Sequence, residues 1–141
     1  MANWGAKTVI HRPAVGSLWV GLGCGRGTSL AGMEAALTAV LSSAGLAREA
    51  IAGIATVDRK GDEVALLQLC AQGGYPLVTF TPEELAAIPV PTPAKIVAAT
   101  LGTPSVAEAA ALKASGGKLL VPKQVFRDLQ GSAVTVAIAL G

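Results

Sequence analysis

The chain has 141 residues, 52% of them apolar and 14% charged, and its formal net charge is +2. This length fits one domain with a real core, and this composition excludes an intrinsically disordered chain. One histidine and two cysteines are too few for a zinc site or a secreted disulfide framework. Lysine and arginine do not cluster with aromatic residues, which argues against nucleic-acid binding.

No stretch approaches the roughly 20 consecutive apolar residues that a membrane span needs. Basic residues precede an apolar run, Ala14 to Leu22, as in a signal peptide, but glycines interrupt the run and no cleavage pattern follows it. We therefore expect a cytoplasmic protein without a membrane contact. Residues 1–16 are predicted to be an N-terminal arm, with His11 on its surface, and residues 17–141 to be the folded domain.

In chain order, the clearest pattern is a strand, a glycine-rich turn and a helix. Leu18 to Leu22 is a short apolar run that predicts a buried strand. Apolar residues then recur at helical spacing from Leu30 to Ala44. Thr28 or Ser29 is suited to cap this helix, and Gly45 is suited to end it.

Strands and helices alternate along the rest of the chain. Three prolines from Pro89 to Pro93 force an extended connection, and Pro122 to Ser132 is either a long hairpin loop or a single-turn crossover. Capping boxes at Thr81 and at Ser105 mark two helix starts, and Asp62 can cap a third. The expected strands are Ile51 to Val57, Leu77 to Phe80, Lys118 to Val121 and Ala133 to Leu140, and the expected helices are Glu63 to Gln72, Pro82 to about Ala87, and one from Ser105 and Glu108 to Gly116.

This alternation predicts an α/β fold. We expect a single three-layer domain with a mostly parallel or mixed sheet of about five strands and helices on both faces. In such sheets, ligands bind beyond the carboxyl ends of the strands, where the following loops converge. Two loops of the chain meet this condition.

The first loop runs from Gly23 to Ser29. Its glycines permit close backbone approach, and the free amides of a helix N-terminus favour an anion. Arg26 adds a forked donor for a carboxylate or a phosphate. The alternative is a tight turn whose glycines only allow helix and strand to pack. The loop matches neither common nucleotide-binding fingerprint, so nucleotides rank below other anions.

The second loop, Asp58 to Glu63, contains both acidic and basic residues. Asp58 and Lys60 are expected at the same edge of the sheet as Arg26, where the three side chains could clamp a ligand. The alternative is a solvated charged turn in which Asp62 caps a helix.

Both cysteines are interpreted as small hydrophobic residues of the core. A position at a helix N-terminus could depress the pKa of Cys24, but a nucleophile needs a base nearby and His11 lies in the arm. Cys70 lies on the apolar face of a helix. No metal site and no cofactor are expected.

Four segments carry a resemblance to a known family: Gly21 to Thr28 (GLGCGRGT), Asp58 to Glu63 (DRKGDE), Ser105 to Leu112 (SVAEAAAL) and Val134 to Ala139 (VTVAIA). In this order they resemble the signature segments of the CbiG/CobE family of cobalamin-biosynthesis proteins. The resemblance covers nearly the whole chain, and Gly25 replaces one of the family's usual pair of basic residues.

The resemblance implies a role in the cobalamin pathway. Long CbiG members open the δ-lactone of cobalt-precorrin-5A and release acetaldehyde, whereas this chain resembles their C-terminal domain and, in size, stand-alone CobE. We expect a carrier or accessory factor that binds a carboxylate-rich precorrin or corrin intermediate. Two alternatives stay open: a hydrolase with Asp58 or Glu108 as general base, and a scaffold for pathway methyltransferases. The residues expected to bind the ligand are Gly23, Cys24, Gly25, Arg26, Gly27, Thr28, Asp58, Lys60, Ser105 and Lys123.

Overall fold

The computed structural model describes residues 17–24, 28–58, 63–88, 106–127 and 133–141. The N-terminal arm and the proline-rich connection at 89–93 lie outside these residues. In chain order, the elements are β1 (Leu18–Cys24), α1 (Leu30–Ala44), the short 3-10 helix η1 (Arg48–Ala50), β2 (Ile51–Val57), α2 (Val64–Gly73), β3 (Leu77–Phe80), α3 (Pro82–Ala86), α5 (Val106–Ser115), β4 (Lys118–Arg127) and β5 (Ala133–Leu140).

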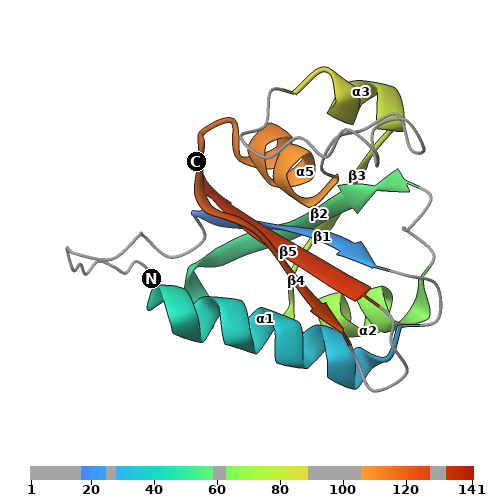
Figure 1. The fold of residues 1–141 in the computed structure, drawn as a ribbon, viewed down its shortest axis with the longest axis vertical. Coiled ribbons are helices and arrows are strands. Elements are labelled where there is room, and N and C mark those ends of the chain that lie inside the picture. The colour runs from blue at the N-terminus through green and yellow to red at the C-terminus, as the bar shows by residue number, and fades with distance from the viewer. Residues whose placement is uncertain (1–16, 25–27, 59–62, 89–105, 128–132) are drawn as a thin grey trace.

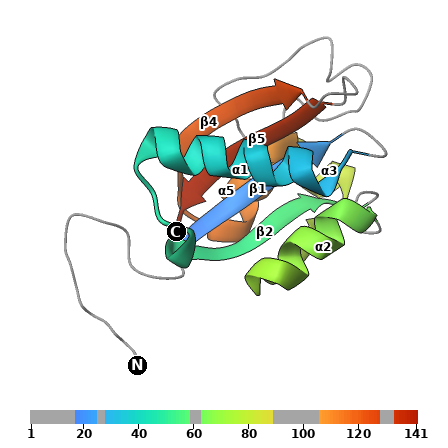
Figure 2. The same ribbon diagram turned by 90° about the horizontal axis from the view of Figure 1, so that it is seen from below.

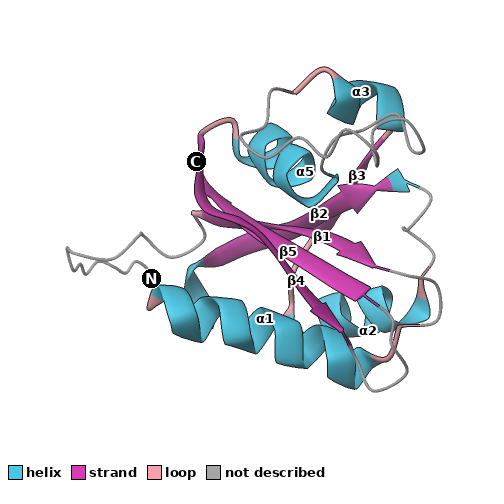
Figure 3. Ribbon diagram, in the orientation of Figure 1, coloured by secondary structure: helices cyan, strands magenta, loops and turns pink. Residues whose placement is uncertain are grey.

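The strands form one mixed sheet of five strands in the order β3-β2-β1-β5-β4. β1, β2 and β3 are parallel, whereas β5 is antiparallel to both of its neighbours. Figures 1 and 2 show α1 and α2 on one face of the sheet, and α5 and α3 on the other. Figure 3 shows the same three layers coloured by secondary structure. The predicted α/β domain with a mixed sheet is therefore confirmed.

Local side chains set the helix ends where the sequence predicts them. Ser29 caps α1 by accepting a hydrogen bond from the Gly32 amide at 3.0 Å, and Gly45 ends α1 with a left-handed φ of 69°. Thr81 and Glu84 form the predicted reciprocal capping box, with distances of 2.8 and 3.1 Å. The predicted cap of α2, Asp62, lies outside the described residues.

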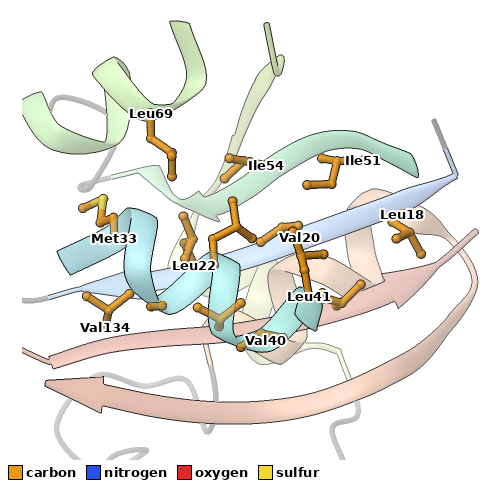
Figure 4. Close-up of a cluster of buried hydrophobic side chains, with 14 of the residues drawn as sticks. Leu18, Val20, Leu22, Met33, Val40, Leu41, Ile51, Ile54, Leu69 and Val134 are labelled. Carbon is orange, nitrogen blue, oxygen red and sulfur yellow. The ribbon is translucent and has the colours of Figure 1, made fainter. Parts of the chain in front are cut away.

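Large aliphatic side chains fill the space between the sheet and the layer of α1 and α2. Figure 4 shows side chains of β1, β2, β5, α1 and α2 converging there, among them Leu22, Met33 and Leu69. All three are at most 1% exposed. This cluster is the main core of the domain, and its burial is the main source of stability for the α1 side.

The other face of the sheet is packed with much smaller residues. Buried alanines of α5, including Ala107 and Ala111, lie directly against β1. A Cβ added at Gly21 would overlap the carbonyl oxygen of Ala107 and lie 3.0 Å from the Ala111 amide nitrogen. The glycine therefore allows the backbones of α5 and β1 to approach closely.

β4 is longer than the sequence predicts. We expected a strand over Lys118 to Val121 followed by a loop or a crossover, but the strand continues through Pro122 to Arg127, so that prediction is wrong for residues 122–127. The pairing with β5 shifts register on both sides of Val121. A proline is tolerated here because β4 is an edge strand with bulges, where an amide donor is not needed at every position.

Candidate functional site

The carboxyl ends of β1, β2 and β3 meet at one edge of the sheet, which we call the carboxyl edge. α1 and α2 begin at this edge, and the first turn of α5 also lies near it, because Ala107 packs against Gly21. β5 begins there as well, where Val134 pairs with Cys24. The chain leaves β1 across one face through α1 and reaches β4 across the other face through α5. Open α/β sheets bind ligands at edges with this arrangement.

The pairing between β1 and β2 stops before the two strands end. The last paired residues are Gly21 and Ala55, although both strands continue beyond them. The buried hydroxyl of Thr56 then donates a hydrogen bond to the carbonyl of Leu22 at 2.6 Å. A side chain thus replaces the ladder at the carboxyl edge and holds the two strand ends together there.

Three predicted ligand residues of the first loop are described by the structure. Gly23 is half-buried, and among the residues that the structure describes a Cβ added there would meet only the side chain of Thr135, at 3.9 Å. Cys24 is half-buried against the main core, in agreement with its interpretation as a small hydrophobic residue. Thr28 is only 3% exposed. Gly23 and Cys24 are thus more exposed than Thr28.

The N-terminus of α1 is partly satisfied by the protein itself. The Ser29 hydroxyl accepts from the Gly32 amide, and the Ser29 carbonyl accepts from the Met33 amide at 3.1 Å. These two amides are therefore not available to a ligand, and an anion would have to use amides of the first two α1 residues or of the loop before them. The loop residues outside the described part of the chain are Gly25, Arg26 and Gly27.

Asp58 directly follows β2 at the carboxyl edge, as the sequence predicts, and its side chain is exposed. Lys60 lies outside the described residues, as does Arg26. The predicted clamp made by these three side chains therefore stays a prediction.

A hydrogen bond that the sequence does not predict joins Glu108 to Lys123. Glu108 is fully buried in the first turn of α5, and its Oε2 accepts a hydrogen bond from the backbone amide of Lys123 at 3.0 Å. Lys123 lies where the pairing of β4 with β5 shifts register between Val121 and Gln124. The carboxylate thus satisfies a strand amide at the bulge. Its predicted capping partner, Ser105, lies outside the described residues.

The two candidate general bases do not lie together. Asp58 follows β2, whereas Glu108 is bonded to β4, and β1 and β5 lie between these strands. Three strand spacings amount to roughly 14 Å. Asp58 is exposed and Glu108 is fully buried, so Asp58 is the candidate that a substrate could reach.

Cys70 is buried in α2, and desolvation raises the pKa of its thiol to about 11, which makes it a poor nucleophile at neutral pH. Within the described ranges, no three His, Cys, Asp or Glu side chains gather as a metal site would require. Among the same residues, no helix combines the length and the apolar character that crossing a bilayer demands.

Comparison with known proteins agrees with the four signature segments. Residues 18–139 match the family described as Cobalamin synthesis G C-terminus. A cobalt-precorrin-5A hydrolase from Priestia megaterium is 32% identical over 132 residues, which are 94% of this chain and 34% of that protein. The chain thus spans about a third of the length of this curated relative.

Two solved structures have the same fold over most of their length. CobE, a protein from the cobalamin biosynthetic pathway, is 27% identical with a TM-score of 0.69, and the match covers 95% of this chain and 100% of CobE. Cobalamin biosynthesis protein chiG from Agrobacterium tumefaciens str. C58 is 30% identical with a TM-score of 0.64, over 87% of this chain and 97% of that protein. The chain therefore belongs to the Cobalamin synthesis G C-terminus family, as its sequence segments predicted.

Proposed function

We propose that this protein binds a carboxylate-rich precorrin or corrin intermediate at the carboxyl edge of its sheet, as a carrier or accessory factor in cobalamin biosynthesis. This proposal rests on the arrangement of α1, β1 and α5 at that edge, in a chain that belongs to this family. α1 and α5 approach it from opposite faces, and β1 lies between them. Gly23 of β1 is half-buried at this edge, and among the described residues a Cβ added there would meet only the side chain of Thr135.

The charges near this edge also favour such a ligand. β4 contributes Lys123, which is half-buried, and Arg127, which is exposed at the end of the strand. Arg26 and Lys60 follow β1 and β2 in the sequence and are expected to add two more cations. Cations that converge on a partly buried edge attract carboxylate arms more strongly than isolated surface charges do.

A titration with hydrogenobyrinic acid, a cobalt-free corrin with free carboxylates, tests the proposal. Binding is expected to shift the visible spectrum of the corrin and to saturate at one equivalent or fewer. Lys123→Met should weaken binding by about tenfold, since one charged contact contributes roughly 1.4 kcal/mol or more. Lys118→Met is the matched control, because Lys118 lies at the opposite end of β4. A wild-type titration without a spectral shift would contradict the proposal.

A second candidate function is hydrolysis of cobalt-precorrin-5A, which is favoured by the 32% identity to the hydrolase from Priestia megaterium. In this reading the exposed Asp58 is the general base that activates water. The expected products are acetaldehyde and a corrin with an opened lactone, detected by a coupled dehydrogenase and by mass spectrometry. Asp58→Asn should abolish release but keep corrin binding. Binding without any turnover in the wild-type protein would leave only the carrier function.

A further inference from the structure

The sheet has an open row of three residues at the carboxyl edge. Gly23 of β1 pairs with Thr135 of β5, and Thr135 pairs with Val125 of β4. Paired residues in neighbouring strands point to the same face of a sheet, so the three positions form one row across three adjacent strands. We call this row the shelf.

The shelf faces the side of the sheet on which α5 lies. Gly21, which precedes the shelf in β1, packs against Ala107 of α5. Val134 and Phe126, the neighbours of the shelf in β5 and β4, belong instead to the cluster beneath α1. Because successive residues of a strand point to opposite faces, the shelf residues face the α5 side. The shelf is thus the next row toward the carboxyl edge after the row that α5 covers.

The shelf is more exposed than the row that α5 covers. Gly23 and Thr135 are half-buried, and the Val125 side chain is 54% exposed. The alanines of α5 that pack on the preceding row, in contrast, are fully buried, with Ala111 at 0%. Three adjacent strands span roughly 10 Å, so the shelf offers a flat surface rather than a single contact.

A cation borders the shelf. Arg127 follows Val125 by two residues in β4 and pairs with Ala133, so it lies on the same face, and it is exposed. A flat surface of small and apolar groups with a cation at its rim complements a ligand that is planar and apolar at its centre and carries carboxylates at its periphery. This combination of shape and charge is what a carboxylated macrocycle presents.

We propose that the shelf is the surface on which the ring of a carboxylate-bearing tetrapyrrole lies, with one carboxylate arm directed to Arg127. This inference rests on the proposed function and deepens it by choosing a face. The other side of the carboxyl edge also has exposed apolar side chains, Val64 at 66% and Leu67 at 45%, at the start of α2. Arg127 lies on the shelf side, and we therefore assign the ring to the shelf.

Titrations of hydrogenobyrinic acid with three variants of the full chain test this assignment. Gly23→Val places a branched side chain over the shelf, in a strand position where a Cβ clashes with none of the described residues. We expect the Kd to rise about tenfold or more for Gly23→Val and about three- to tenfold for Val125→Ser, which removes apolar contact from an exposed site. Val64→Ser is the matched control, with the same substitution of an exposed valine on the α2 side, and its Kd should not change.

The outcomes separate this inference from the function on which it rests. If the wild-type protein does not bind the corrin, the proposed function fails and the shelf fails with it. If the wild-type protein binds and Gly23→Val and Val125→Ser bind equally well, the shelf is wrong and the function stands. A higher Kd for Val64→Ser with an unchanged Kd for Val125→Ser would place the ring against α2 and would also overturn the inference.

Discussion

Substitution of Gly21 by alanine tests the close approach of α5 to β1. The new Cβ would overlap the carbonyl oxygen of Ala107, and it would lie 2.8 Å from the Ala107 carbonyl carbon and 3.0 Å from the Ala111 amide nitrogen. All three atoms belong to the backbone of α5. No rotation of a side chain can relieve the overlap, so the helix itself has to move away from the sheet.

The expected cost follows from this geometry. Overpacking of a core costs about 1–3 kcal/mol when side chains and backbone can adjust. Here the obstacle is helix backbone, and its displacement also opens space around buried alanines such as Ala110, so we expect about 3 kcal/mol. In a domain somewhat larger than this one, a loss of 1 kcal/mol lowers the melting temperature by about 2–4 °C. We therefore expect the melting temperature of Gly21→Ala to fall by about 10 °C.

Thermal and urea denaturation followed by circular dichroism measure this effect. Gly23→Ala is the control, because Gly23 lies on the same strand and the same face, and its Cβ would meet, of the residues described, only Thr135 at an ordinary distance of 3.9 Å. Its stability should stay the same or rise by up to about 1 kcal/mol, since alanine reduces the entropy of the unfolded chain. If Gly21→Ala melts within about 2 °C of the wild-type protein, α5 does not lie against β1 as described.

Substitutions at three further residues test buried groups of the domain. Thr56→Val should lower the free energy of unfolding in urea by about 1–3 kcal/mol, because the buried Leu22 carbonyl loses its hydroxyl donor. Thr56→Ser keeps a hydroxyl and should lower it clearly less. Equal losses in the two variants would contradict the role of the hydrogen bond. Glu108→Ala should cost about 2–4 kcal/mol, because it leaves the Lys123 amide without its acceptor and empties a buried site, and Glu108→Gln should recover part of this loss. Burial raises the pKa of the Cys70 thiol from 9.0 to about 11. As the pH rises, the unfolded state therefore loses the thiol proton before the folded state does. The contribution of Cys70 to the free energy of unfolding should be constant below pH 9 and fall between pH 9 and 11. Cys70→Ala should lack this fall, and a similar pH profile in both proteins would contradict the assignment.

The sequence predicts the helix ends and most strands because their signals are local. The hydroxyl of Ser29 and the left-handed Gly45 act within a few residues of α1, and so does the capping box at Thr81. β4 was predicted too short because the rule against proline in strands depends on where the strand lies in the sheet. Pro122 is acceptable only because β4 is an edge strand with a bulge, which no local pattern reveals.

The position of Asp58 was predictable, but the hydrogen bonds of Glu108 and Thr56 were not. The carboxyl edge follows from the alternation of strands and helices, and Asp58 lies where that rule places it. Glu108 bonds to the Lys123 amide, 15 residues away in another element, a contact that neither its predicted capping box nor its predicted role as a general base includes. Thr56 gave no signal, since a threonine is ordinary in a strand. Long-range hydrogen bonds of this kind cannot be inferred from spacing.

Two alternating glycines of β1, Gly21 and Gly23, differ in what surrounds them. Gly21 and Gly23 share a face of the same strand, separated by roughly 6.6 Å, the length of two strand residues. Gly21 lies beneath the first turn of α5 and has no room for a side chain, whereas at Gly23 a Cβ would meet, within the described part of the chain, only Thr135 at 3.9 Å. Ala107, in the first turn of α5, covers Gly21, and Gly23 lies one row closer to the carboxyl edge. Among the described residues, the first turn of α5 therefore separates the packed part of this face from the half-buried shelf.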